Sequence, residues 1–341
     1  IAYVKFQRMN DCNHEPCQCH DTQLLHYWNV RGDGMNKIYS GFHQLPHGNA
    51  STMVQEGCIV LEGGAFRGLY GEGVLDALML ENINLRCTIG VSAGAMNGLN
   101  YVSGQIGRSI RMNLKYRHDK RYVGRKALQN GEGLIGFAFA FHQADQEYPF
   151  DKKRFFQFDR RFIAVATNCE TAEPAYFEKD HCRDIFQAVQ ASASMPFISK
   201  MVWMEGYPYL DGGCSDKIPF DWALREGYKK IIVVRTRPLS YRKKTDSITR
   251  KLPLGKTIYR PYPKFMKALE EMDANYNRQC EALEILQEQK RVYVIAPSQP
   301  VTVGRLEPDL EKLGSLYWMG YYDTRRQIQD IRRYLQQDGS I

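Results

Sequence analysis

The sequence predicts an α/β fold built around a parallel sheet. Short apolar runs bounded by glycines alternate with longer segments in which apolar residues recur at helical spacing. The clearest example runs from a strand expected at 58–62, through a helix expected at 69–83, to a strand expected at 85–90. Strand–helix–strand units of this length form parallel strands joined by right-handed crossovers.

The rest of the chain continues this alternation. Glycine and proline mark the limits of several segments, and Glu205-Gly206 joins two short strands into a hairpin. The expected strands are 162–167, 175–177, 201–204, 207–210, 230–234 and 292–295, and the expected helices are 93–102, 106–116, 184–193, 219–226, 265–289 and 310–337.

Composition places the chain among ordinary soluble proteins. It has 341 residues, of which 43% are hydrophobic and 25% charged. No apolar run approaches the length of a transmembrane helix, and no signal peptide is visible at the start. The nine cysteines are scattered, and their odd number argues against a complete disulfide framework. We therefore expect a cytoplasmic protein, with peripheral membrane association as an open alternative.

Residues 1–52 differ from the remainder, with little periodicity and many Asn, His, Gln and Gly residues. Three cysteines and two histidines crowd together in this segment, at Cys12, His14, Cys17, Cys19 and His20. Their spacing matches no standard zinc finger or ribbon, so we expect no metal site. The sequence predicts an N-terminal extension over 1–52, flexible or foreign to the native protein, followed by one domain over 53–341 that includes the C-terminal helices.

Gly90-Val91-Ser92-Ala93-Gly94 has the G-x-S-x-G pattern of a nucleophile elbow at a strand-to-helix turn. Gly90 and Gly94 have no Cβ, so the backbone can turn sharply and lift the Ser92 hydroxyl clear. The helix that follows directs its free N–H groups toward charge that develops beside this hydroxyl. The pattern indicates a nucleophilic serine, and an ordinary Gly/Ser turn is the alternative.

A serine nucleophile also needs an oxyanion hole, and Gly63–Gly68 offers small residues between the first strand and its helix. Successive N–H groups of such a loop can converge on an oxyanion. Glycine turns at this place also bind nucleotides, but Ala65 breaks the G-x-G-x-x-G pattern and no Gly-Lys-Ser/Thr follows. We therefore expect no nucleotide cofactor.

The position of the histidines decides what can act as the base. In an α/β-hydrolase the triad histidine comes late in the chain, but here the eight histidines end at His181. The other candidate is Asp211, which follows a strand and precedes Gly212-Gly213. An Asp-Gly turn is the structural alternative. An aspartate with an ordinary pKa is a weak base, so hydrogen bonding and a dry site must assist it.

Taken in this order, the loop at Gly63–Gly68, the elbow and Asp211-Gly212-Gly213 resemble the patatin-like phospholipases, in particular their bacterial branch. The resemblance covers roughly Glu56–Val234 and includes Ala166-Thr167-Asn168, Ala193–Phe197 and Ile218-Pro219. It implies a three-layer α/β/α sandwich with a mainly parallel central sheet.

The resemblance also implies roles for single residues. Ser92 is the nucleophile and Asp211 the base of a Ser–Asp dyad, while Gly63, Gly64 and Ala65 match the oxyanion loop and Arg67 the basic residue after it. Ala65 departs from the family pattern, which has glycine there. Its methyl group is tolerated if the φ angle of Ala65 is negative.

The activity implied is hydrolysis of carboxylic esters of (lyso)phospholipids or other lipids through an acyl-enzyme. It requires no metal, and no segment resembles a calcium loop. A general carboxylesterase acting on small soluble esters and a catalytically silent lipid-binding module are the alternatives. The apolar stretch 134–141 can line or cover an acyl pocket, or it can be a buried helix.

Arg235–Lys267 contains eleven lysines and arginines against the single acidic residue Asp246. Tyrosines and Phe265 are interleaved with these charges. Such a stretch suits contact with anionic lipid head groups, and a solvated basic loop explains it equally well. No nucleic-acid-binding motif accompanies the charge, so we expect no nucleic acid partner.

Overall fold

An eight-stranded sheet forms the centre of the protein in the computed structural model, which describes residues 38–124, 126–127, 135–244 and 257–337. The strand order is β10-β9-β2-β3-β5-β8-β7, and β6 pairs with β5 outside this path. The strands are β2 (Gln55–Leu61), β3 (Leu85–Val91), β5 (Arg161–Asn168), β6 (Pro174–Glu178), β7 (Val202–Met204), β8 (Tyr207–Asp211), β9 (Ile231–Val234) and β10 (Tyr293–Ile295).

Neighbouring strands from β10 to β5 run parallel, whereas β6, β8 and β7 pair in the antiparallel direction. The mainly parallel sheet expected from the sequence is therefore confirmed. Two further short strands, β1 (Gly48–Asn49) and β4 (Gln105–Ile106), pair with each other apart from it.

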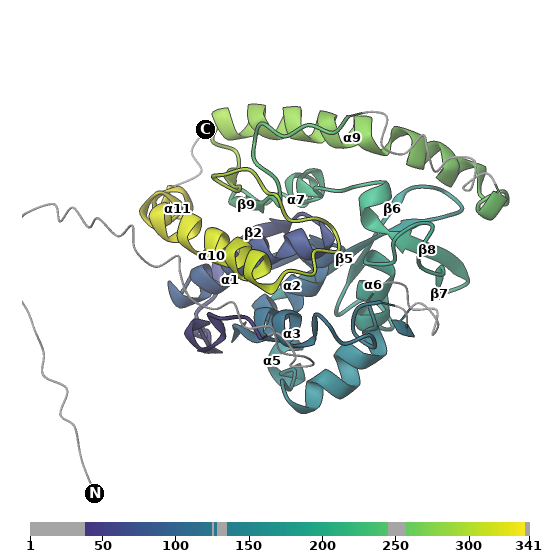
Figure 1. Cartoon of the computed structure of the whole chain (residues 1–341). Coiled ribbons are helices and arrows are strands. Elements are labelled where there is room, and N and C mark those ends of the chain that lie inside the picture. Colours follow the sequence, from purple (N-terminus) through teal and green to yellow (C-terminus); the bar gives the residue numbers. More distant parts are fainter. Residues whose placement is uncertain (1–37, 125, 128–134, 245–256, 338–341) are drawn as a thin grey trace, which may run out of the picture. The chain divides into compact units, whose positions relative to one another are not determined.

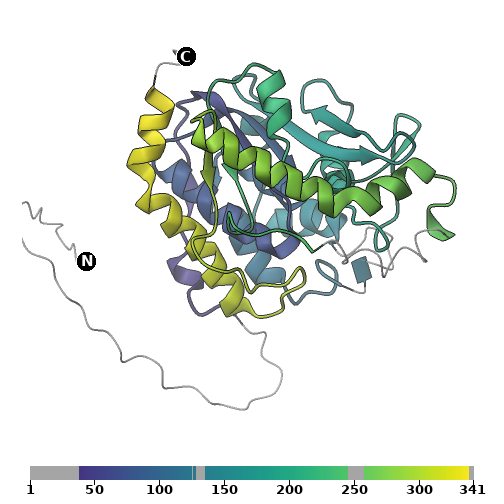
Figure 2. The same cartoon turned by 90° about the horizontal axis from the view of Figure 1, so that it is seen from above.

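Helices cover both faces of the sheet (Figures 1 and 2). Alternate residues of β2 show the division, since Ile59 and Leu61 pack into one core cluster and Cys58 and Val60 into another. The first face carries α1 (Leu69–Leu80), α2 (Ala93–Val102), α3 (Arg108–Tyr116), α6 (Ile185–Ser192), α10 (Leu310–Arg326) and α11 (Ile328–Gln336), and the second carries α7 (Phe220–Arg225) and α9 (Pro263–Glu288). This is the predicted α/β/α sandwich. The short α5 (Lys152–Phe155) precedes β5.

Helices α1 and α10 cross with their backbones in contact. A Cβ atom on Gly73 would lie 2.0 Å from the carbonyl oxygen of Tyr317, and one on Gly320 would lie 2.0 Å from that of Tyr70. Only glycine fits at such a crossing. The helix after the loop at Gly63–Gly68 is therefore packed directly against a C-terminal helix.

The single helix expected over 310–337 is divided at Gln327, which has φ −108° and ψ 15°. The Gln327 side-chain amide donates a hydrogen bond to the carbonyl oxygen of Asp323. Its backbone N–H instead bonds to Thr324, one residue short of the α-helical partner. Local side-chain competition for a helical carbonyl thus ends α10, and α11 begins at the next residue.

The described residues 38–52 belong to the same compact unit as the residues after the boundary expected at 52/53. Tyr39, Leu45 and Ala50 are buried in the same core cluster as α1 and α10. The crowded residues from Cys12 to His20 lie outside the described residues. Residues 38–52 therefore pack with the domain, and the assignment to an extension stays a prediction for the residues before them.

Arg235 corrects the expected basic surface over Arg235–Lys267. Its side chain is fully buried, forms an ion pair with Glu62 at 3.7 Å and donates a hydrogen bond to the Tyr276 hydroxyl. Arg235 lies at the end of β9, in the core of the sheet, and its charge is neutralised there by a buried partner. Residues 245–256 lie outside the described ranges, while Arg260, Lys264 and Lys267 are exposed.

Candidate active site

Ser92 lies at the sharp turn between β3 and α2, with φ 56° and ψ −123°. A non-glycine residue in this region typically costs about 1–3 kcal/mol of backbone strain. Two consecutive hydrogen bonds stabilise this conformation. The Ser92 N–H donates to Ser192 Oγ at 2.8 Å, and Ser192 Oγ donates to the carbonyl oxygen of Val165. Ser192 has no recognisable pattern around it in the sequence, and sequence reasoning missed it.

The glycines around Ser92 are required because backbone segments approach one another closely. A Cβ atom on Gly90 would lie 2.6 Å from the Ala95 nitrogen, and one on Gly94 would lie 2.3 Å from the carbonyl oxygen of Leu61. Gly63 packs against Ser92 itself, since a Cβ atom added to Gly63 would lie 2.9 Å from Ser92 Cβ. The end of β2 and the turn at Ser92 are thereby held in contact.

The loop after β2 presents two free amides beside Ser92. Gly64 has φ 177° and Ala65 has φ 51°. The condition of a negative φ at Ala65 is therefore not met, and its methyl group is accommodated in the left-handed region, where L-residues lose about 1–2 kcal/mol. Among the residues that the structure describes, no acceptor is hydrogen bonded to the amide of Gly64 or Ala65.

Asp211 ends β8 and lines the same cavity as Ser92. Its Oδ1 accepts the N–H of Gly213 at 2.8 Å, and its backbone N–H donates to Ser194. Burial raises the pKa of Asp211, and the hydrogen bond from Gly213 and the Ser92 side chain oppose this rise. The carboxylate is thus a stronger base than an exposed aspartate. Among the described residues, no histidine lines a cavity that contains Ser92.

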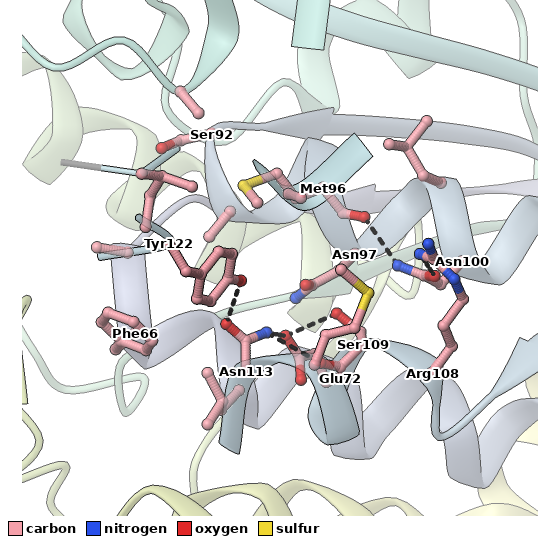
Figure 3. A pocket seen from close by; sticks show the side chains of 18 of the residues that line it. Phe66, Glu72, Ser92, Met96, Asn97, Asn100, Arg108, Ser109, Asn113 and Tyr122 are labelled. Carbon is pink, nitrogen blue, oxygen red and sulfur yellow. Dashed lines mark hydrogen bonds between the residues drawn. The ribbon is translucent and has the colours of Figure 1, made fainter. Parts of the chain in front are cut away.

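Two cavities meet at Ser92. The first, called here the helix-lined cavity, lies between α1, α2 and α3 and is shown in Figure 3. Ala140 and Phe141 belong to its lining, so part of the apolar stretch 134–141 lines a cavity, while Leu134 lies outside the described residues. Its apolar lining includes Phe66, Leu69, Met96, Leu99 and Met112, and its polar lining includes Glu72, Asn97, Asn100, Arg108, Ser109, Asn113 and Tyr122.

The second, called here the cationic cavity, contains Ser92, Asp211 and three basic side chains, Arg67, Lys217 and Arg305. Two nearby cations already form ion pairs, Arg235 with Glu62 and Lys243 with Asp273. Within the described ranges, no carboxylate forms an ion pair with Arg67, Lys217 or Arg305. The positive charge of this cavity is therefore open to an anion from outside.

Burial and the repulsion between neighbouring cations lower the pKa values of Arg67 and Lys217. The pKa of Arg67 is lowered to about 10 by burial and by Arg237 and Arg305. The pKa of Lys217 is lowered to about 7, first by burial and then by Lys243. Only 8% of Arg67 is exposed, and its Nε has no hydrogen-bond partner. Sequence reasoning identified Arg67 but missed Lys217 and Arg305.

Residues 59–224 match the model of the patatin-like phospholipase family, and both Ser92 and Asp211 lie within this match. This part of the chain belongs to the patatin-like phospholipase family. A second match covers residues 262–336 and is described as a domain of unknown function. Arg305 and Leu306 come from this second region, as do Leu269 and Met272 of the cationic cavity, so both matched regions line the cavities at Ser92.

Two curated proteins are similar to the patatin-like region. The uncharacterized protein YjjU of Escherichia coli is 31% identical over 187 residues, which are 53% of this chain and 52% of YjjU. The probable lipid hydrolase 463L of Invertebrate iridescent virus 6 is 26% identical over 192 residues, which are 50% of this chain and 64% of that protein. The chain therefore matches between about half and two thirds of these relatives.

Among solved structures, VipD from Legionella pneumophila aligns with 88% of this chain and 72% of its own. The sequence identity is 14% and the TM-score 0.40, a likeness too weak to support an argument. The patatin-like assignment rests on the family match instead.

Proposed function

We propose that the chain is a serine acyl hydrolase that cleaves carboxylic esters of lipids with a Ser92–Asp211 dyad. The observation that carries this proposal is that Ser92 and the partly buried Asp211 line one cavity, where the Ser92 side chain lowers the pKa of the Asp211 carboxyl against the effect of burial. The two side chains come from separate strands, and the amides of Gly64 and Ala65 line the same cavity. A nucleophile, a base and free amide donors are the groups that acyl transfer needs.

In the first half of the reaction, Ser92 Oγ attacks the ester carbonyl carbon and its proton passes to the Asp211 carboxylate. The carbonyl oxygen becomes an oxyanion, which the amides of Gly64 and Ala65 stabilise, with Gly63 completing the loop. The tetrahedral intermediate collapses when the C–O bond to the alcohol breaks. The departing alcohol takes the proton from Asp211 and leaves an acyl-enzyme on Ser92.

In the second half, a water molecule attacks the acyl-enzyme carbonyl and Asp211 accepts one of its protons. The second tetrahedral intermediate expels Ser92 Oγ, which takes this proton back. Raised basicity of Asp211 favours both proton transfers, because the pKa of a buried carboxyl lies closer to neutral pH. Positive charge at Arg67 adds to the stabilisation of the oxyanion.

The cationic cavity favours lipids with a phosphate group over small neutral esters. Guanidinium and ammonium groups are the usual partners of phosphate oxygens. Arg67, Lys217 and Arg305 all line the cavity that contains the dyad. We therefore place the head group of a (lyso)phospholipid there, with the general carboxylesterase as the second candidate.

Contact with an anionic membrane surface is also part of this proposal. Arg260, Lys264 and Lys267 are exposed at and beside the start of α9, and each basic residue near an anionic bilayer contributes about 1 kcal/mol of attraction. None of the helices in the described part of the chain is both long and apolar enough to cross a bilayer.

The test is hydrolysis of p-nitrophenyl esters from acetyl to palmitoyl by the wild type, Ser92→Ala and Asp211→Ala, with labelling by a fluorophosphonate. We expect activity on longer chains, a loss of about 10³-fold or more in both variants, and labelling that disappears in Ser92→Ala. Activity limited to short chains would favour the carboxylesterase. Near wild-type turnover by Asp211→Ala would disprove the dyad, and an unlabelled wild type would favour a silent lipid-binding module.

A further inference from the structure

The helix-lined cavity follows one face of α2 away from the nucleophile. Its wall contains residues that recur at helical spacing along α2, namely Ser92, Met96, Asn97 and Asn100. At a rise of about 1.5 Å per residue, Asn97 lies about 7–8 Å and Asn100 about 12 Å beyond Ser92 along the axis. An extended chain advances about 1.2 Å per bond, so these positions are roughly six to ten bonds from the ester carbon.

The wall is mixed along this path. Phe66, Leu69, Met96, Leu99 and Met112 are apolar, and polar side chains of α1, α2 and α3 lie among them (Figure 3). Glu72 of α1 is at its centre and is 4% exposed. Its Oε1 accepts hydrogen bonds from Ser109 Oγ at 2.9 Å and Asn113 Nδ2 at 2.8 Å. The apolar side chains accept an alkyl chain, and the polar ones offer hydrogen-bonding groups beside it.

Two atoms of this polar wall have no hydrogen-bond partner among the residues that the structure describes. Glu72 Oε2 is buried without a hydrogen bond, and among the described residues no donor is bonded to Asn97 Oδ1, although Asn97 Nδ2 donates to Gly68. Burial raises the pKa of Glu72 to about 8, so the carboxyl is protonated at neutral pH. Because Oε1 accepts two hydrogen bonds, the proton belongs on Oε2, which is then a donor without an acceptor.

Asp76, one helical turn further along α1, shows what a purely structural buried carboxyl looks like. It is 6% exposed, and burial raises its pKa to about 7. Its Oδ1 accepts the N–H of Gly107 at 3.0 Å and its Oδ2 accepts the Tyr317 hydroxyl at 2.7 Å. Both oxygens are used, and Asp76 does not line the cavity. An unpaired buried polar group costs about 1–3 kcal/mol, and Glu72 Oε2, unlike either oxygen of Asp76, has no partner among the described residues.

We propose that the helix-lined cavity binds an acyl chain that carries a hydroxyl or carbonyl oxygen about six to ten bonds beyond the ester carbon. This inference rests on the proposed acyl hydrolase function. The oxygen accepts the hydrogen bond of Glu72 Oε2, and a hydroxyl also donates to Asn97 Oδ1. The chemical class of the substrate is therefore an ester of a hydroxylated or oxidised fatty acid.

The test compares p-nitrophenyl esters of dodecanoic, 3-hydroxydodecanoic and 8-hydroxydodecanoic acid on one protein preparation. The oxygen of the 8-hydroxyl lies about eight bonds beyond the ester carbon, within the predicted range of about six to ten, and that of the 3-hydroxyl lies outside it. We expect kcat/KM for the 8-hydroxy ester to exceed that for the plain ester by about tenfold, the worth of one well-placed hydrogen bond. The 3-hydroxy ester gains nothing.

Variants then assign the effect to Glu72. In Glu72→Leu the preference for the 8-hydroxy ester disappears, whereas the matched variant Asp76→Asn keeps it. A ratio of two substrates is independent of the folded fraction, so a loss of stability does not imitate the result. Where Glu72→Leu fails to fold, Asn97→Leu removes the other partner and lowers the same ratio. A plain ester preferred by the wild type, or an unchanged ratio in the variants at Glu72 and Asn97, overturns the proposal.

A wild type that hydrolyses none of these esters would disprove the proposed function and would leave the cavity to be tested by binding. Ser92→Ala is then titrated with 8-hydroxydodecanoic acid and dodecanoic acid in a calorimeter. Tighter binding of the hydroxy acid, lost in Ser92→Ala combined with Glu72→Leu, supports the inference about the cavity. Equal affinity for the two acids overturns it.

Discussion

The two cavities that meet at Ser92 differ in how their polar groups are satisfied. In the cationic cavity, no carboxylate of the described residues is paired with Arg67, Lys217 or Arg305. In the helix-lined cavity, hydrogen bonds within the wall satisfy Glu72 except at one oxygen. The first cavity suits a formal negative charge and the second a neutral chain with one polar atom. An ester placed at Ser92 then has its alcohol and acyl parts on chemically different sides.

The largest effect is expected when positive charge is removed from the cationic cavity. Lys217→Met and Arg305→Met should lower kcat/KM for a lysophospholipid by about 10- to 100-fold, because hydrogen bonds to charged groups are worth about 1.5–3 kcal/mol. The monoacylglycerol with the same acyl chain should change less than about threefold, since it has no phosphate to lose. Both rates are measured on each variant.

Lys312→Met is the matched control, because Lys312 is exposed on α10 and lines neither cavity. Equal losses on the phosphate-bearing and the neutral lipid would show that Lys217 and Arg305 act on folding or chemistry rather than on the head group.

A second prediction concerns the crossing of α1 and α10, which lies outside both cavities because neither Gly320 nor Tyr70 lines them. Gly320→Ala places a Cβ atom against Tyr70, on the crossing of α1 and α10. We expect a loss of about 1–3 kcal/mol in the free energy of unfolding, as for other overpacked sites, measured by denaturant titration. Activity at elevated temperature should fall equally for phosphate-bearing and neutral substrates.

Gly304→Ala is the control for this crossing, because a Cβ atom there meets nothing within 4 Å. A stable Gly320→Ala protein would contradict the close contact of the two helices.

The third prediction concerns how the buried carboxyl of Glu72 makes the stability of the protein depend on pH. The pKa of Glu72 is about 8 in the folded protein and about 4.3 in an unfolded chain. Between these values the folded state binds more protons, so this carboxyl stabilises the protein fully at low pH and the stabilisation is lost as the pH rises toward 8. Glu72→Gln has no such carboxyl and does not lose this stabilisation. The melting temperature of Glu72→Gln minus that of the wild type should therefore be larger at pH 9 than at pH 5. A parallel pH dependence in the two proteins would contradict a protonated Glu72.

The smallest effect is expected at Ala65. Glycine adopts its φ of 51° without the contact of a Cβ atom. Ala65→Gly should change the free energy of unfolding by less than about 1 kcal/mol, because the relieved contact and the greater entropy of the unfolded chain oppose each other. Ester hydrolysis should stay within about threefold of wild type. A loss of 100-fold or more would show that the methyl group positions the loop amides.

Prediction from the sequence succeeded where a function leaves a local pattern. The alternation of apolar runs predicted the parallel strands, and the patatin-like resemblance predicted the three layers around them. It failed where the outcome depends on side-chain bonds and ion pairs that periodicity does not show. Gln327 divides the C-terminal helix through a side-chain bond that periodicity does not reveal, and the charge of Arg235 was expected on the surface although Glu62 holds it in the core.

Local patterns were enough to predict the turn at Ser92, the strand that ends at Asp211 and the glycine loop that precedes them, because glycine spacing and strand ends are local properties. The side chains that surround these groups follow from tertiary packing. Glu72, Lys217 and Arg305 lie in separate segments, and as single charged residues they have no distinguishing pattern. Their function depends on burial and on which partners are absent, and both arise only when α1, α3 and the C-terminal region pack around the nucleophile.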